Sequence, residues 1–303
     1  MASYAVQSAL VIDMLPIVGR FNEFALKGGT AINYFILEMP RLSVDIDLCY
    51  LPIANRTQSL AGISNGLKKI KQQIEKMYPN IRVLPRSVEK GYTTSLLIYR
   101  DEVTIKIEPN LVIRGSVFPP ERRSLSPKVA EEMGKDVKMT ILSLADIYGG
   151  KICAALDRQH PRDLFDIKLL LEKFGLTDSI RQAFVVYLIS HSRPMAELLA
   201  PRRLGISTGF AAEFLNMVRV PIKMNELLDA REQLISQIHN TMTLDERSLI
   251  LSVKTGEPQW ELFPIKGIER LPAVQWKLKN IRKMSLQKHQ TAVENLKNIL
   301  KFN

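Results

Sequence analysis

The segment of residues 24–52, FALKGGTAINYFILEMPRLSVDIDLCYLP, places an Asp-Ile-Asp triplet inside an apolar stretch. Side chains alternate along a strand, so Asp45 and Asp47 share one face while Ile46 and Leu48 point to the other. Carboxylates are depleted in strands, and two on one face repel each other. A divalent cation removes this repulsion, because Mg²⁺ takes one or two protein carboxylates and completes its shell with water and phosphate oxygens. The triplet therefore indicates a metal site on a strand.

Two glycines, Gly28 and Gly29, precede the triplet and lead into a predicted helix over residues 30–39, with Thr30 as its N-cap. Bare backbone N–H groups and the positive end of the helix dipole form an anion site at such a helix start. A third carboxylate, Glu108, ends an alternating strand predicted over residues 103–108. Alone, a Gly-Gly pair usually marks a turn and an Asp-x-Asp a solvated strand. In this order they are typical of a nucleotide-binding, metal-dependent phosphoryl-transfer site.

Composition adds a basic balance to these motifs. The chain has 303 residues, with 42 Lys and Arg against 31 Asp and Glu, a net charge of +11. This excess suggests a polyanionic partner, either nucleic acid or the phosphates of a nucleotide. The two cysteines lie in apolar surroundings, and the sequence shows no apolar run of 18 residues and no basic leader. These features predict a soluble cytoplasmic protein without a membrane partner.

Hydrophobic periodicity divides the chain into a mixed half and a helical half. Helices are expected over residues 4–18 and 64–78, and strands over 23–26, 44–50, 81–85, 93–99 and 103–108, the last two joined by a hairpin at 100–102. Residues 109–140, which contain four prolines, read as irregular. From residue 143 the pattern is helical, apart from loops near residue 160 and over 192–205 and 256–267. We therefore expect an α/β domain of residues 1–140 and a helical domain of residues 141–303.

These motifs resemble those of the DNA-polymerase-β-like nucleotidyltransferases, and within them the AbiEii/AbiGii-type toxins with their MenT-like relatives. The resemblance lies in LKGGTAINYF, RLSVDID and IKIE. It implies a core of mixed sheet with flanking helices, followed by a mainly α-helical C-terminal domain. It also implies that Asp45 and Asp47 are catalytic and, with Glu108, hold Mg²⁺ or Mn²⁺. The residues that it assigns to nucleotide binding here are Gly28, Gly29, Thr30, Arg41 and Ser43.

The resemblance continues in SLADIYGGKICAALDRQHPRDLFDIKLLL, residues 143–171. The family carries a lysine on a helix and then an Arg-x-Lys-Asp-x-x-Asp motif in this region. The resemblance implies that Lys151 and Asp166 are catalytic. Nucleotide binding is assigned to Lys151, Arg158, Arg162 and Asp163.

Helical spacing supports this second cluster. Lys151 and Arg158 are seven residues apart, about two turns on one face, and Asp163 and Asp166 are three apart. One carboxylate could anchor a cation and the other accept a proton from the attacking hydroxyl; we favour Asp166 for the second role, since Asp163 is also a candidate helix cap. His160 stands where the family has an arginine, which makes that cation pH-dependent.

The resemblance implies a function. An NTP would be the substrate, an RNA, namely the 3′ end of tRNA, would be the acceptor, and the enzyme would be the toxin of a toxin–antitoxin or phage-defence pair neutralised by a cognate antitoxin protein. Residues 266–301 carry nine Lys or Arg that could follow an RNA backbone, and Trp276 is expected in the core. Two alternatives stay open: transfer to a protein or small-molecule hydroxyl, and a non-catalytic nucleotide- or RNA-binding module.

Overall fold

A computed structural model describes residues 4–87 and 91–302. Contacts divide the chain into two compact units. The first comprises residues up to 143 together with Glu213–Pro221, and the second comprises residues 144–212 and those from 222 onward. Compactness does not show independent folding, so the division into domains 1–140 and 141–303 stays a prediction.

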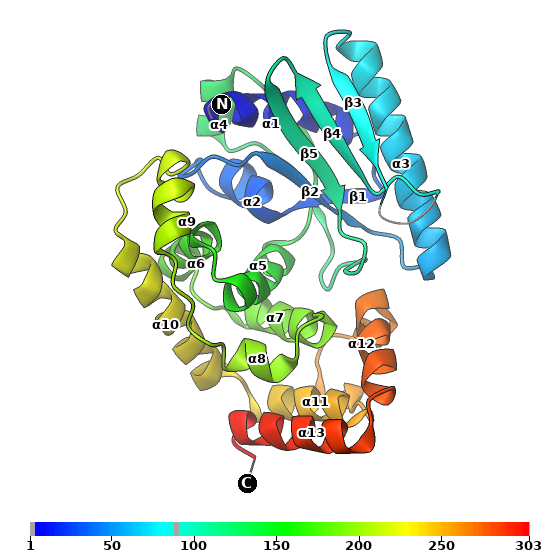
Figure 1. Ribbon diagram of the computed structural model, residues 1–303, viewed down its shortest axis with the longest axis vertical. Coiled ribbons are helices and arrows are strands. Elements are labelled where there is room, and N and C mark those ends of the chain that lie inside the picture. Colours follow the sequence, from blue (N-terminus) through cyan, green and yellow to red (C-terminus); the bar gives the residue numbers. More distant parts are fainter. Residues whose placement is uncertain (1–3, 88–90, 303) are drawn as a thin grey trace. The chain divides into compact units, whose positions relative to one another are not determined.

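Seven strands of the described residues form one mixed sheet in the first unit (Figure 1). Strand β2 is parallel to β5 and antiparallel to β1, and β1 is parallel to β7; the other pairs are antiparallel. The hairpin expected at residues 100–102 is present, with Arg100 opposite Val103. In spatial order the strands are β3 (Arg82–Arg86), β4 (Ser95–Arg100), β5 (Val103–Pro109), β2 (Asp45–Tyr50), β1 (Phe24–Lys27), β7 (Lys138–Ile141) and β6 (Glu121–Ser124).

Helices α1 (Tyr4–Val18) and α3 (Arg56–Met77) contact each other and pack on one face of this sheet. Two glycines of α3 allow the close approach, because a Cβ at Gly62 or Gly66 would overlap the rings of Tyr50 and Phe24. The apolar stripe of α3 is buried and follows helical spacing: Leu60, Ile63, Leu67, Ile70 and Ile74.

Two boundaries differ from the sequence prediction. Residues 109–140 are not irregular, since they contain β6, α4 (Pro127–Met133) and β7. These elements have four to seven residues, too few for a hydrophobic period to stand out. Helix α3 starts at Arg56 rather than at residue 64, because the Asn55 side chain caps it by accepting from the N–H of Gln58 at 2.9 Å.

The second unit is mainly helical, as expected. Helix α5 packs closely on α7 at Gly149, where a Cβ would lie 2.9 Å from the backbone of Ala183. The predicted loops over residues 192–205 and 256–267 contain the short helices α8 and η3. The helices are α5 (Leu144–Arg158), α6 (Pro161–Lys173), α7 (Asp178–Ser190), α8 (Met195–Leu199), α9 (Ser207–Ala212), α10 (Met224–Thr241), α11 (Leu244–Thr255), η3 (Trp260–Leu262), η4 (Ile268–Arg270), α12 (Pro272–Arg282) and α13 (Leu286–Leu300).

The segment Glu213–Pro221 returns to the first unit from the helical half of the chain. It begins with the short helix η2 (Phe214–Asn216). Its backbone then pairs with residues 40–42: the N–H of Leu42 donates to Met217 O and the N–H of Arg219 donates to Pro40 O, both at 2.8 Å. This pairing fixes the chain that enters β2.

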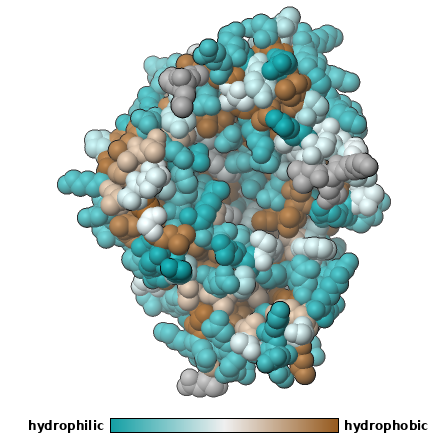
Figure 2. Space-filling view, viewed as in Figure 1, coloured by the Kyte–Doolittle hydropathy of each residue, from teal (hydrophilic) through white to brown (hydrophobic). Residues whose placement is uncertain are grey.

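Within residues 4–87 and 91–302, no helix has the length and apolar character needed to cross a membrane. Hydrophilic residues cover most of the face seen in Figure 2, and apolar residues are scattered among them.

Candidate active site

The two glycines after β1 lie directly against the residues of the second motif. Gly28 has a φ of +70°, and a Cβ there would lie 2.4 Å from Oδ2 of Asp47. A Cβ on Gly29 would lie 2.7 Å from Nη2 of Arg41 and 3.1 Å from Oγ of Ser43. Only glycine combines the left-handed backbone at position 28 with this close approach. The structure therefore brings these five predicted residues together.

The helix after the glycines differs from the predicted one. It begins at Gly28 as an α-helical turn, α2 (Gly28–Thr30), and continues as a π-helix, η1 (Ala31–Ile36). The N-cap prediction for Thr30 is wrong, because Thr30 lies inside the helix with φ −66° and ψ −42°. Its hydroxyl instead lies 2.9 Å from Ser43 Oγ and 2.5 Å from the carbonyl oxygen of Asp45, and it can donate to either. Thr30 thus fastens the start of β2 to the helix.

Tyr34 is a site residue that sequence reasoning missed. Its fully buried hydroxyl accepts from Ser43 N at 2.8 Å, donates to Ser43 O at 2.7 Å and lies 2.6 Å from Ser8 Oγ. Burial raises the pKa of Tyr34, so the hydroxyl keeps its proton. In the sequence this tyrosine looks like one more apolar residue of a helix. In the structure it holds the Ser43 backbone in place.

The two aspartates lie on the face of β2 opposite α3, with Asp45 exposed and Asp47 half-buried. The parallel register places Glu108 of β5 beside Asp47, and Lys106 beside Asp45. Glu108 is half-exposed and pairs with Lys106 at 2.7 Å. In the described part of the chain, no three His, Cys, Asp or Glu side chains converge on one point.

This donor set fits a hard divalent cation. Mg²⁺ takes its ligands from oxygen atoms and needs only one or two protein carboxylates, which Asp45 and Asp47 supply from one strand face. Glu108 is in the adjacent register position but is engaged by Lys106. Its predicted role as third ligand stays a prediction.

A second cluster lies within the helical unit. Lys151 of α5 contacts two carboxylates of α6, Asp163 and Asp166, each at 2.9 Å. Arg158, also on α5, donates to both oxygens of Asp163, at 2.6 and 3.2 Å. Lys151 and Arg158 therefore share a face of α5, as their spacing predicts. Asp166 is 0% exposed, whereas the Arg158 side chain is 64% exposed.

Two cations, Lys151 and Arg158, keep the buried Asp163 carboxylate ionised. Burial by itself would raise the pKa of Asp163, but Lys151 and Arg158 outweigh burial and hold that pKa well below its usual range. Asp163 is therefore an anion at neutral pH. Asp166 has no exposed surface and lies against Lys151, so this geometry suits positioning of the lysine. The direct catalytic role of Asp166 stays a prediction.

The turn between α5 and α6 corrects one further expectation. His160 is the N-cap of α6, since its ring Nδ1 accepts from the N–H of Arg162 at 3.2 Å. Asp163 is thus not the cap of α6. Because Nδ1 must be unprotonated to accept this bond, the His160 ring acts here as an acceptor. Protonation of Nδ1 would remove this cap, and the predicted pH dependence at this position stays a prediction.

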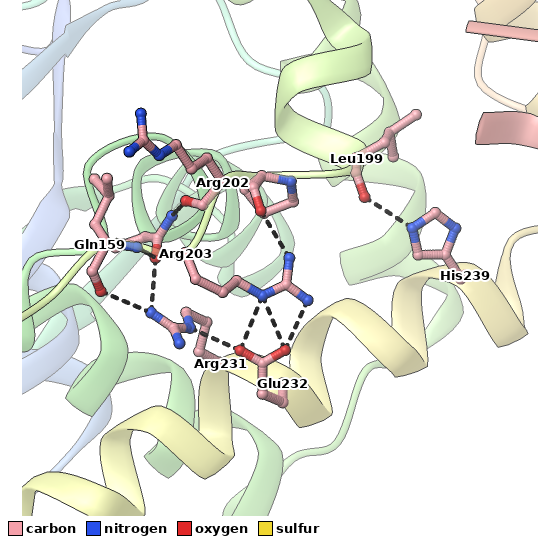
Figure 3. A network of polar contacts seen from close by, with 9 residues as sticks. Gln159, Leu199, Arg202, Arg203, Arg231, Glu232 and His239 are labelled. Carbon is pink, nitrogen blue, oxygen red and sulfur yellow. Dashed lines mark hydrogen bonds and ion pairs between the residues drawn. The ribbon is translucent and has the colours of Figure 1, made fainter. Parts of the chain in front are cut away.

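Gln159 anchors the same turn (Figure 3). It has a φ of +50°, and its side chain donates to Arg202 O at 2.7 Å. Its Oε1 accepts from the N–H of Leu204 at 3.0 Å and from Nη1 of Arg231, on α10, at 2.9 Å. Arg231 in turn pairs with Glu232. A lone glutamine gives no signal in the sequence, yet it ties the turn beside Arg158 to α10.

With this geometry in view, comparisons with known proteins decide the family. The family model described as "Nucleotidyl transferase AbiEii toxin, Type IV TA system" matches residues 10–280. The chain belongs to this family. It is therefore a nucleotidyltransferase enzyme of a toxin family, and the type IV toxin–antitoxin description implies an NTP substrate and an antitoxin partner. The resemblance found in the motifs is confirmed.

One solved structure shows the same fold, and a second was found with a low TM-score. The nucleotidyltransferase toxin MenT4 from Mycobacterium tuberculosis H37Rv is 13% identical, with a TM-score of 0.63 over 97% of this chain and 93% of that one. Terminal uridylyl transferase 4 from Trypanosoma brucei, solved with bound dUTP, is 13% identical, with a TM-score of 0.30 over 98% of this chain and 91% of that one. No curated protein sequence matches the chain. The predicted fold class is confirmed.

Proposed function

We propose that this enzyme transfers a nucleoside monophosphate from an NTP to an RNA acceptor, the 3′ end of tRNA, with a divalent metal ion. The observation that carries the proposal is the contact between the Gly28 backbone and the Asp47 carboxylate, with Asp45 on the same strand face. This contact supports an anion-binding turn beside a cation-binding pair. A triphosphate bound to a metal ion needs both.

In the proposed reaction the acceptor hydroxyl loses its proton to a base, its oxygen forms a bond to the α-phosphorus, and the bond to pyrophosphate breaks. Asp45 and Asp47 would hold Mg²⁺ or Mn²⁺, which supplies neutralisation of phosphate charge. The N–H groups of the Gly28–Gly29 turn would donate to phosphate oxygens. Arg41 lies against this turn, beside Gly29. Catalysis then rests on positioning and on charge neutralisation by groups already in place.

The cluster of α5 and α6 remains a predicted source of nucleotide contacts. We assign phosphate binding to Lys151, held in position by Asp163 and Asp166 at 2.9 Å each. Arg158 is fixed at one end by Asp163 while most of its side chain is exposed, so it can reach a ligand. Arg162, in the first turn of α6, stays a predicted nucleotide contact.

The C-terminal helices support an RNA acceptor. Trp276 of α12 is 52% exposed, so its expected place in the core is wrong. The buried stripe of α12 and α13 occupies the other positions: Val274, Leu278, Ile281, Leu296 and Leu300. Lys279 Nζ lies 5.8 Å from the Trp276 ring centroid. An exposed aromatic ring beside a cation is a surface on which RNA bases stack.

A transfer assay tests the proposal. Each α-labelled NTP is incubated with Mg²⁺, total tRNA and the enzyme, the Asp45→Asn variant, or the matched control Asp136→Asn, whose carboxylate is exposed and distant in sequence from the motif. We expect label in tRNA with the wild type and with the control, and none with Asp45→Asn or with EDTA. Label on protein in the absence of RNA would show that the acceptor is a protein and not an RNA. Absence of label everywhere would favour a non-catalytic module.

Growth tests the biological part. Expression of the wild type should slow a host that lacks the antitoxin, and Asp45→Asn should not. Normal growth with the active wild type would refute the toxin role while leaving the transfer chemistry intact. The cytoplasmic location stays a prediction.

A further inference from the structure

The helical unit contains a pocket of about 440 Å³ that shares no residue with either cluster described above. Its walls come from the first turns of α7 and α11 and from residues 261–266, which begin in η3. All of these residues belong to the second unit. The volume lies in the range of pockets that bind small ligands. The proposed transfer reaction makes no use of this pocket.

Arg181 supplies a hydrogen-bond donor to the pocket. The residue is 7% exposed. Its Nε donates to both carboxylate oxygens of Glu246, at 3.0 and 2.9 Å, and its Nη1 donates to Asp178 at 2.6 Å. The remaining nitrogen, Nη2, has no acceptor among the described residues, and it is not one of their buried atoms that lack a partner. A ligand that enters the pocket can therefore reach Nη2.

Glu246 holds Arg181 in place. Glu246 is 3% exposed and closes the capping box of α11. One of its carboxylate oxygens accepts from the N–H of Thr243 at 2.9 Å, while its own N–H donates to Thr243 Oγ at 3.2 Å. The glutamate is thus fixed by the start of α11 and in turn fixes the guanidinium. A donor that is already positioned loses little freedom when it binds a ligand.

The charge of Arg181 is already balanced by Glu246 and Asp178. Nη2 therefore suits a neutral acceptor such as a carbonyl oxygen. Two further carboxylates of the pocket, Asp245 and Glu261, are exposed and form no ion pair within residues 4–87 and 91–302. An ionised carboxylate can only accept hydrogen bonds, so these two groups call for N–H donors on a ligand.

The third property of the pocket is an apolar wall. It is formed by Leu262, Phe263 and Pro264. A matching ligand must combine a carbonyl oxygen, N–H donors and an apolar ring face. Lys266 lines the same pocket, is exposed and supplies a cation for a phosphate attached to such a ligand.

We propose that this pocket binds an unpaired nucleobase that carries both a carbonyl oxygen and an amino group, namely guanine or cytosine. The carbonyl oxygen accepts from Nη2 of Arg181, and the amino group donates to Asp245 or Glu261. Arginine pairs with guanine O6, and carboxylates accept from the cytosine amino group, in the known recognition of base edges. Adenine has no carbonyl oxygen and uracil has no amino group, so both match the pocket less well.

The base can belong to a free nucleotide or to single-stranded RNA, in which unpaired bases expose these edges. Base binding goes beyond the transfer reaction, and only the RNA source rests on the proposed function. The test variant carries Asp245→Asn together with Glu261→Gln. Its matched control carries Asp229→Asn together with Glu257→Gln, which removes two exposed carboxylates outside the pocket. Both double variants should melt at the wild-type temperature, since none of the four carboxylates is buried.

The first arm measures the affinity of guanosine, cytidine, adenosine and uridine by titration NMR in EDTA. Nucleosides carry no phosphate, so binding at the glycine turn and at the aspartates does not contribute. Guanosine or cytidine should bind more tightly than adenosine and uridine. The test variant should lose about 10-fold in that affinity, and the control should not. Equal binding of all four nucleosides, or no difference between the two double variants, would overturn the proposal.

The second arm measures fluorescence anisotropy of labelled oligoadenosine RNA with and without one guanosine or cytidine in its centre. Tighter binding of the substituted RNA by the control than by the test variant would identify RNA as the source of the base. Nucleoside binding without this difference would identify a free nucleotide. Because the transfer assay depends on Asp45 and this site does not, failure of the pocket and failure of the proposed function are separate results.

Discussion

The contact between Gly28 and Asp47 allows a sharp test of the candidate site. In Gly28→Ala, the new Cβ would lie 2.4 Å from Asp47 Oδ2, whereas an ordinary contact begins at 3.4 Å. The carboxylate must therefore retreat by about 1 Å. Misplacement of a catalytic group by about 1 Å can cost about 100-fold in rate. We expect kcat for nucleotidyl transfer to fall by about that factor.

The same substitution also strains the backbone, because Gly28 has a φ of +70°. A side chain in the left-handed region costs roughly 1–2 kcal/mol of stability. Each kcal/mol lowers the melting temperature by about 2–4 °C. Gly134→Ala is the matched control: its φ is +60°, and a Cβ there meets nothing within 4 Å. Both variants should lose similar stability, but only Gly28→Ala should lose activity. Wild-type activity in Gly28→Ala would refute the reasoning. Equal losses of transfer activity in Gly28→Ala and Gly134→Ala would refute it as well.

Three further predictions concern residues that support the two clusters. Asp163 has a lower pKa in the folded protein than in the unfolded chain, so the folded protein binds fewer protons at a pH between the two pKa values. The stability of the protein should therefore fall as the pH drops below about 4. In urea unfolding, Asp163→Asn should show less of this loss of stability. Asp166→Asn removes one of two carboxylates from buried Lys151 and should cost about 3 kcal/mol in urea unfolding; a cost near zero would contradict the buried pair. Tyr34→Phe leaves both backbone groups of Ser43 without this partner and should cost about 1–3 kcal/mol in the same assay, with reduced transfer activity; unchanged activity would show that Tyr34 does not position the motif.

The sequence alone predicts which site residues share a face of one strand or one helix. Strand alternation placed Asp45 and Asp47 on one face, and helical spacing placed Lys151 and Arg158 on one face of α5, because both periods follow from the backbone geometry of a single element. Thr30 was misjudged, since its hydroxyl found partners on a neighbouring strand rather than at the helix start.

By itself, then, the sequence determined the fold class, the family and the residue types of the candidate site, since these depend on local periods and short motifs. Only the tertiary structure decided which distant residues meet. The β2–β5 register aligns Glu108 with Asp47, and residues 213–221 return to hold the chain before β2. The physical reason is that such pairings are chosen by burial and hydrogen bonding across the whole unit, and no short window of sequence contains both partners.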